Sequence, residues 1–330
     1  MTDHSFTRFI NMASPRLGAE VIFATDDFFA DKSRLIKDEE AVFIPGKYDD
    51  NGKWMDGWES RRKRGQGFDH CILKLGQAGI IKGLDIDTSH FTGNFPPAAS
   101  VEACFSNADT PGEEAEWIEI VPSMNLNGDS HHLVAVENDT PFTHLRLNIY
   151  PDGGVARLRV YGEFYKVWQE SDYGKEMDLL AMENGGRPII ANNEHFGVLS
   201  NIMQPGKGIN MGDGWETRRR REPGNDWAIV ALGHAGEINR ILVDTAYFKG
   251  NFPESISLQA ARVAGGTDDS LPVQSQFWEE LMPRQKLTAD AEHTFESELN
   301  KLGSISHVRI NIYPDGGISR LRLFGTLDKE

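Results

Sequence analysis

Two short stretches combine residue types that can bind and transform a small charged molecule. The first is Asp-Gly-Trp-Glu-Ser-Arg-Arg at residues 56–62, and the second is Asp-Gly-Trp-Glu-Thr-Arg-Arg at residues 213–219. In each, a glutamate that can transfer protons lies between a tryptophan and two arginines, whose guanidinium groups match a carboxylate. The sequence therefore predicts chemistry on a small anion at two equivalent places.

Further polar residues near these stretches extend the candidate site. The candidate acid/base residues are the acidic and imidazole side chains Glu59, Glu216, Asp87, His90, His144 and His307. The candidate substrate-binding residues are Arg61, Arg62, Arg218, Arg219, Trp58, Trp215, Asn94 and Asn251.

Each candidate also has an ordinary structural explanation, and the sequence leaves both readings open. The tryptophans suit a core, and the glutamates suit salt bridges to the neighbouring arginines. Asp87 ends an apolar run, where its side chain can cap a turn. His144, Arg146 and Asn148 fall on one face of a strand, which can simply be its polar outer face.

The arginine runs stand out because the chain is acidic overall. The formal net charge is −16, from 34 basic and 50 acidic residues. Such a chain repels nucleic acid and acidic membranes over most of its surface, so we expect neither as a partner. Arg61–Arg64 and Arg218–Arg221 could still be solvated loops paired with nearby acids, or anion sites.

An internal duplication organises the chain. The two stretches lie 157 positions apart, as do Asp87-Thr88 and Asp244-Thr245, and Gly-Asn-Phe-Pro at residues 93–96 and 250–253. The spacing is 167 before these stretches and 163 after them, so length changes fall between the matched segments. His90 corresponds to Tyr247, which shows that the copies are not equivalent everywhere.

Short alternating runs predict strands in both copies. Leu145, Leu147 and Ile149, then Leu158 and Val160, predict a β-hairpin through the turn at 151–154, with Arg157 and Arg159 on its polar face. The same pattern in Val308, Ile310, Ile312, Leu321 and Leu323 predicts a second hairpin. Residues 175–184 read as an amphipathic helix. We therefore expect an all-β fold of two sandwiches, at 1–170 and 187–330, joined by a linker at 171–186.

Other features bound the function. The chain has 330 residues, which suits two domains, and its only cysteines, Cys71 and Cys104, lie in apolar runs that favour buried thiols. Residues 1–11 contain no long apolar stretch, so we expect neither a signal peptide nor a membrane span. No phosphate loop, dinucleotide fingerprint or Cys-x-x-Cys occurs. We expect no cofactor and no dedicated metal site.

The duplicated stretches, with Asp-Thr-x-x-Phe-x-Gly-Asn-Phe-Pro and Asn-Ile-Tyr-Pro-Asp-Gly-Gly, closely resemble the allantoicase family across nearly the whole chain. The resemblance implies two tandem jelly-roll β-sandwiches, similar to galactose-binding-type modules. It also implies hydrolysis of allantoate to ureidoglycolate and urea in purine degradation. We further expect a cytoplasmic homo-oligomer.

Two rival explanations remain at this stage. Tandem sandwiches commonly bind a small acid or sugar without chemistry, since a fold alone does not decide function. A duplication used only for assembly is the other, although it leaves the arginine runs unexplained.

Overall fold

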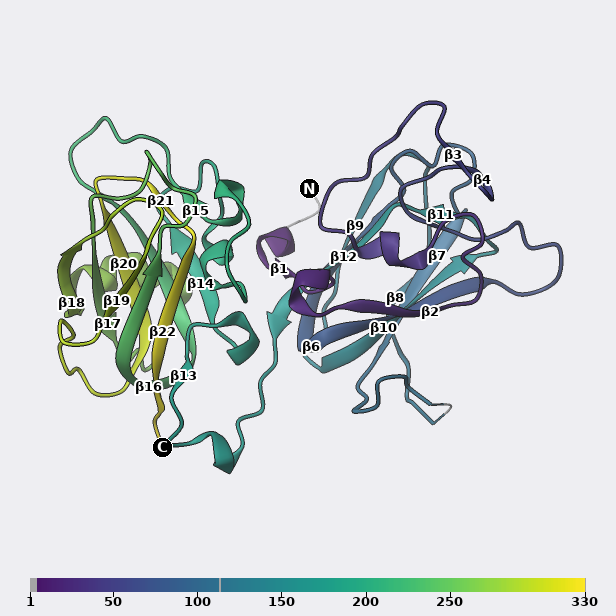
Figure 1. Ribbon diagram of the computed structural model, residues 1–330. Coiled ribbons are helices and arrows are strands. Elements are labelled where there is room, and N and C mark those ends of the chain that lie inside the picture. The colour runs from purple at the N-terminus through teal and green to yellow at the C-terminus, as the bar shows by residue number, and fades with distance from the viewer. Residues whose placement is uncertain (1–4, 113, 330) are drawn as a thin grey trace. The chain divides into compact units, whose positions relative to one another are not determined.

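The computed structural model describes residues 5–112 and 114–329, and the chain divides into two compact units, Met1–Tyr165 and Lys166–Glu330. Strands make up most of the regular secondary structure of each unit, with short helical turns and loops between them (Figure 1). This confirms the predicted all-β class and its duplication. Both cysteines are free and buried, also as predicted. Among the described residues, no helix is long and apolar enough to cross a membrane.

The described residues of the first unit form twelve strands and three short 3-10 helices. The helices are Ser5–Arg8, Pro15–Leu17 and Lys32–Ile36. The strands are β1 (Ile10–Asn11), β2 (Glu20–Ala24), β3 (Tyr48–Asp49), β4 (Gly52–Lys53), β5 (Trp58–Glu59), β6 (Asp69–Asp87), β7 (Ala98–Cys104), β8 (Ile118–Asn125), β9 (His131–Ala135), β10 (Pro141–Tyr150), β11 (Gly154–Val155) and β12 (Arg157–Phe164).

The second unit repeats this order, but its described residues contain no hairpin equivalent to β3–β4. Its strands are β13 (Met177–Asp178), β14 (Arg187–Ala191), β15 (Trp215–Glu216), β16 (Asp226–Asp244), β17 (Ser255–Ala261), β18 (Glu279–Lys286), β19 (Glu292–Phe295), β20 (Ile305–Tyr313), β21 (Gly317–Ile318) and β22 (Arg320–Leu327). Its helical segments are the 3-10 turns Glu170–Asp172, Met182–Asn184, Leu199–Met203, Met211–Asp213, Asp268–Ser270 and Ser275–Phe277, and α1 (Leu271–Gln274).

One long strand in each unit belongs to both layers of the sandwich. The first part of β6 pairs with β2 and β10, and its last part pairs with β12 and β9. The sheet continues from β10 through β7 to β8, and from β12 to β1. The same pairings recur around β16. Gly76 lies where β6 changes layer, and a side chain there would meet the Leu17 carbonyl oxygen at 1.9 Å.

The predicted core register is correct, whereas the predicted hairpin is wrong. Leu145, Leu147 and Leu158 are at most 1% exposed, so the apolar positions of β10 and β12 face the core. However, β10 and β12 do not pair with each other; each pairs with β6, β10 mainly along residues 69–74 and β12 along residues 79–87. The Pro-Asp-Gly-Gly segment therefore carries the chain across the sandwich, because alternation fixes a strand's face and not its neighbour.

The predicted helix at 175–184 is also wrong. Met177–Asp178 forms β13, which pairs with β22 as β1 pairs with β12. Only Met182–Asn184 forms a 3-10 turn, which ends at Gly185 in the left-handed conformation. These residues are thus the opening of the second unit, equivalent to residues 10–17 at a spacing of 167.

A buried ion pair joins the loops to the sheet in each unit. Arg157, which is 0% exposed, donates through Nη2 to Asp56 Oδ2 at 2.6 Å, and through its other N–H groups to the carbonyls of Asp56, Ala156 and Glu39. Arg320 makes the matching bond to Asp213 at 2.8 Å. The expected polar face of β12 is thus covered by chain rather than by water.

Burial alone would raise the pKa of the Asp56 carboxyl. Hydrogen bonds from Lys37 and Arg157 outweigh that effect and hold the pKa below its usual value. Asp56 is therefore ionised, and its charge depends on the guanidinium beside it.

Replacing Arg157 by Leu should destabilise the protein by about 3–5 kcal/mol, because it leaves a buried carboxylate without its partner. The matched control is Arg61→Ala, which breaks an ion pair to Asp26 whose arginine side chain is 61% exposed. That exposed pair is screened by solvent and should contribute far less than the buried pair. Guanidinium chloride unfolding of both variants provides the comparison, and equal losses would contradict the role given to Arg157.

Candidate functional site

Short strands at the rim of the first unit position Glu59. β5 pairs with β11, with Glu59 opposite Gly154 and Trp58 opposite Val155. Trp58 is fully buried, and its indole N–H donates to the Asp26 carbonyl at 2.8 Å. Neighbouring strand residues point to opposite faces, so anchoring Trp58 in the core turns Glu59 towards the outside. The tryptophan is therefore a structural anchor.

Glu59 forms a carboxylate–amide pair with Asn94. The Asn94 side-chain amide donates to Glu59 Oε1 at 2.7 Å, and the Asn94 carbonyl accepts from the Gly154 N–H at 2.7 Å. Burial raises the pKa of the Glu59 carboxyl, while the Asn94 hydrogen bond acts in the opposite direction. A half-buried carboxyl whose pKa lies above its ordinary value holds a proton more readily than an exposed glutamate, which suits a group that takes and returns protons.

Two adjoining hollows meet at this pair. The larger, of about 440 Å³, is lined by Phe29, Lys53, Met55, Glu59, His90, Thr92, Gly93 and Asn94. The smaller, of about 310 Å³, shares Phe29, Glu59, Gly93 and Asn94 and adds Ser60, Arg62, Phe95, Pro97, Pro151, Asp152 and Gly153. The Glu59–Asn94 pair thus has a lysine and a histidine on one side and an arginine on the other.

His90 is held in an unusual backbone conformation. Its φ of 68° is left-handed, which non-glycine residues seldom adopt, and its backbone N–H donates to Asp129 Oδ1 at 2.8 Å. Its ring Nε2 donates to the Ala41 carbonyl at 3.0 Å. That bond leaves Nδ1 as the nitrogen that can exchange a proton. Backbone strain of this kind tends to gather at functional sites.

The four predicted arginines differ in their partners, and Arg219 makes no hydrogen bond or ion pair among the residues that the structure describes. Arg61 stacks on Phe28 and pairs with Asp26 at 2.6 Å, and Arg218 pairs with Glu222. Arg62 lines the smaller hollow and, within residues 5–112 and 114–329, makes no hydrogen bond or ion pair. Of the two arginines in the first copy, Arg62 is therefore the one available to an anion.

The second unit keeps the carboxylate–amide pair but changes what surrounds it. Asn251 donates to Glu216, and its carbonyl accepts from the Gly317 N–H at 2.8 Å. Trp215 is fully buried like Trp58. Tyr247, with a φ of 70°, takes the place of His90, and Asn210 takes the sequence position of Lys53. The repeats therefore share the buried tryptophan and the glutamate–asparagine pair, which we call the frame. They differ in the titratable side chains around that pair.

The structure does not bring the remaining candidates to these hollows. His144 is buried at the start of β10, where its ring contacts Thr143 Oγ1 and the Asp109 carbonyl. It lies six residues, or about 20 Å, along the strand from Tyr150, next to the hollow's Pro151. His307 contacts Ser306 Oγ and Trp278. Their predicted acid/base roles stay predictions without a supporting contact.

Asp87 also lies outside both hollow linings. Its Oδ1 accepts from the Ser89 N–H at 2.7 Å, which is the capping role that the sequence left open. Within the described part of the chain, Glu40, Asp87 and His131 are the one group of acidic and imidazole side chains close enough to share a metal ion.

Sequence reasoning missed Lys53 and Phe29. Lys53 ends the β3–β4 hairpin, which lies in the segment where the first copy is longer than the second. The insertion directly before the Asp-Gly-Trp-Glu stretch was therefore the sequence feature that could have pointed to Lys53. Phe29 precedes Ala30, which forms a bridge with Glu59, and no sequence pattern indicated that pairing.

Comparison with known proteins agrees with this doubled arrangement. The family model for the allantoicase repeat matches residues 10–165 and again residues 177–328. A probable allantoicase from Photobacterium profundum is 63% identical over 97% of both chains. Probable allantoicase 1 from Burkholderia mallei is 60% identical over 98% of this chain and 96% of its own.

A solved structure extends the agreement to the fold. The crystal structure of allantoicase from Saccharomyces cerevisiae is 34% identical, covers 96% of this chain and 92% of its own, and superposes with a TM-score of 0.77. The resemblance predicted from the duplicated stretches is confirmed, and the chain belongs to the allantoicase family.

Proposed function

We propose that this chain hydrolyses allantoate to ureidoglycolate and urea in purine degradation, with the Glu59–Asn94 pair of the first unit as its reaction site. The family makes the chain a hydrolase of carbon–nitrogen bonds in linear amidines. The observation that carries the site is the half-buried Glu59 carboxyl, whose pKa is raised and which opens into hollows lined by His90 and Arg62.

The substrate's chemistry matches these side chains. Allantoate carries a carboxylate on a carbon that also bears two ureido groups. The Arg62 guanidinium can bind the carboxylate through two hydrogen bonds, and the Asn94 amide can bind a ureido oxygen. Lys53 adds positive charge to the larger hollow. A chain of net charge −16 thus concentrates cations where its anionic substrate docks.

The reaction requires two proton transfers. Glu59 takes a proton from the attacking water or from the ureido nitrogen that remains, and a His90 ring that enters the step protonated on both nitrogens gives the Nδ1 proton to the departing urea nitrogen. The carbon–nitrogen bond to urea breaks, and the hydroxyl group of water takes its place. Each such transfer contributes about 10²–10⁴-fold to the rate.

We assign the reaction to the first unit. We assign to the second unit the binding of a similar small anion without the reaction. Glu216 and Asn251 keep the pair, but Tyr247 offers a phenol in place of the imidazole and no lysine corresponds to Lys53. We also retain, as predictions, a cytoplasmic location and a homo-oligomeric assembly. Analytical sedimentation of the purified chain would test the assembly.

Glu59→Gln should lower kcat for urea release from allantoate by about 10²–10⁴-fold, because the amide cannot accept the proton. Glu216→Gln is the matched control and should lose less than about threefold. Both substitutions keep the side-chain shape, and thermal melts verify folding. Wild-type protein that releases no urea would reject the function, whereas equal losses in both variants would reject its assignment to one unit.

Arg62→Lys should raise KM about tenfold or more with a smaller change in kcat. The anchored carboxylate does not react, so its contacts are nearly the same in the ground and transition states. A lysine cannot reproduce the two parallel bonds of a guanidinium. Arg61→Lys, whose guanidinium already pairs with Asp26, is the control in the first unit, and Arg219→Lys is the counterpart in the second. Unchanged KM in Arg62→Lys would exclude this anchor.

A further inference from the structure

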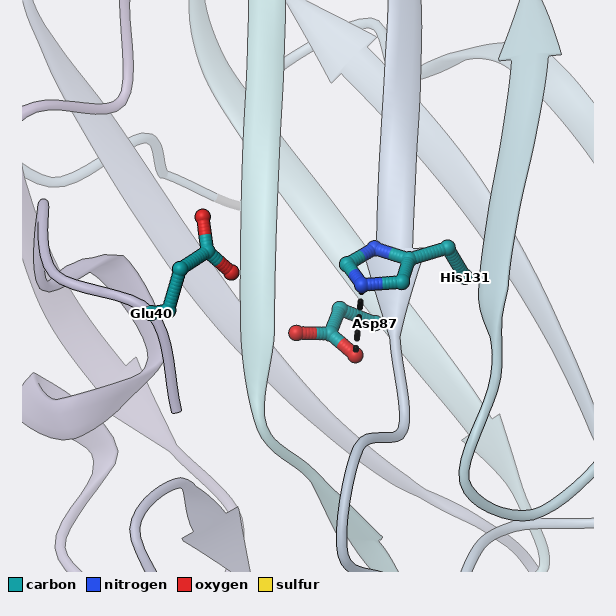
Figure 2. A group of neighbouring side chains, drawn as sticks. All are labelled: Glu40, Asp87 and His131. Atoms are coloured by element: carbon teal, nitrogen blue, oxygen red, sulfur yellow. Dashed lines mark ion pairs between the residues drawn. The ribbon is translucent and has the colours of Figure 1, made fainter. Parts of the chain in front are cut away.

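A second polar cluster lies in the first unit, outside the linings of the two hollows. Asp87 ends β6 and faces His131, the first residue of the adjacent β9, as its partner across the two strands. Glu40 approaches from the loop that follows Lys32–Ile36 (Figure 2). One oxygen or nitrogen atom from each of the three side chains lies within 4.8 Å of the other two.

Asp85 fixes the orientation of the His131 ring. Asp85 Oδ2 lies 2.7 Å from His131 Nδ1, so this nitrogen carries the proton that is donated to the carboxylate. The other nitrogen, Nε2, then faces Asp87 Oδ1 at 3.9 Å. A carboxylate that holds the far nitrogen of an imidazole is the usual support of a histidine that binds a metal ion.

Asp87 also carries an unsatisfied oxygen. The residue is 1% exposed, and within the described residues its Oδ2 has no hydrogen-bond partner. Figure 2 shows this oxygen directed towards the side on which Glu40 lies. Leaving a buried carboxylate oxygen unpaired is costly, so the geometry calls for a positive group between Asp87 and Glu40.

The second unit supplies such a group from its own sequence. The Glu40 carbonyl accepts from Arg157, and the Lys207 carbonyl accepts from Arg320, so these residues are equivalent. Asp244 and Glu292 pair across β16 and β19 as Asp87 and His131 do. The Lys207 ammonium lies 2.9 Å from Glu292. The second unit thus places a lysine where the first unit has Glu40, whose carboxylate is paired with Arg159 through Oε1 alone.

We propose that Glu40, Asp87 and His131 bind a divalent transition-metal cation of the Mn²⁺ or Zn²⁺ type, with Asp85 as a positioning residue. Two carboxylates and one imidazole suit these ions better than Mg²⁺ or Ca²⁺, which prefer oxygen ligands alone. Bonds of about 2.0–2.2 Å place ligand atoms roughly 3–4 Å apart, so the cluster must contract slightly. Glu40, exposed and paired through Oε1 with Arg159 at 3.2 Å, has the freedom to move.

The proposed metal site is connected to the larger hollow through the backbone of residues 40–41. Glu40 precedes Ala41, whose carbonyl accepts the hydrogen bond from His90 Nε2. A cation that fixes Glu40 would therefore fix the chain segment that orients His90. This consequence rests on the proposed function, whereas the binding of the ion does not.

The test is a titration of the chelator-stripped full chain with Mn²⁺, followed by electron paramagnetic resonance of the free ion, with Zn²⁺ as competitor. We expect one saturable site per chain. Glu40→Gln, His131→Asn and Asp87→Asn should each weaken binding at least tenfold, and Asp85→Asn about 10–100-fold. Glu292→Gln, the equivalent change in the second unit, should leave the affinity unchanged.

The exposed variants keep the test decisive even if Asp87→Asn fails to fold. Absence of saturable binding of both ions, or wild-type affinity in Glu40→Gln and His131→Asn, would overturn the site. Urea release is measured in parallel. A chain that binds one ion per molecule without releasing urea would support the metal site and reject the function, and the reverse result would reject the metal site alone.

Discussion

The site in each unit depends on one buried guanidinium. Arg157 is enclosed by chain and joins the start of β12 to Asp56, the first residue of the Asp-Gly-Trp-Glu stretch, and to the carbonyls of the loop at residues 39–40. An arginine can satisfy so many acceptors because its donors are fixed in a plane and always charged. Without it, the loop that carries Ala41 and the strand that carries Glu59 would lose their common anchor. Arg320 has the same role beside Asp213.

Duplication has kept this frame and changed the side chains that it presents. The buried tryptophan, the arginine–aspartate pair and the glutamate–asparagine pair occur in both units. At the rim, His90 is matched by Tyr247, and Glu40 by Lys207. Frame residues are buried and mutually dependent, so a single change there is costly, while rim residues can change singly. The two units thus hold the glutamate–asparagine pair in the same geometry but surround it with different reactive side chains.

The sequence predicted the fold class, the duplication and the register of the core because these depend on local alternation and exact spacing. Of its candidate site residues, Glu59, Asn94, His90 and Arg62 line the adjoining hollows, and their roles stay predictions. It failed where long-range pairing decides. The predicted β10–β12 hairpin was wrong because strands adjacent in sequence were expected to pair, whereas β10 pairs with β6 and β7. The predicted 175–184 helix was wrong because Met177–Asp178 pairs with the distant strand β22. Arg157 was expected on an outer face, since alternation cannot reveal that a distant loop covers it.

The most direct test of this account is the pH dependence of kcat/KM for wild type and Asn94→Ala. If Glu59 is the base, activity falls at low pH as its carboxylate takes a proton, and the midpoint lies above the ordinary glutamate value of 4.5. Asn94 favours the ionised form, so its removal should move that midpoint to higher pH. A midpoint that stays in place or moves to lower pH would contradict the account.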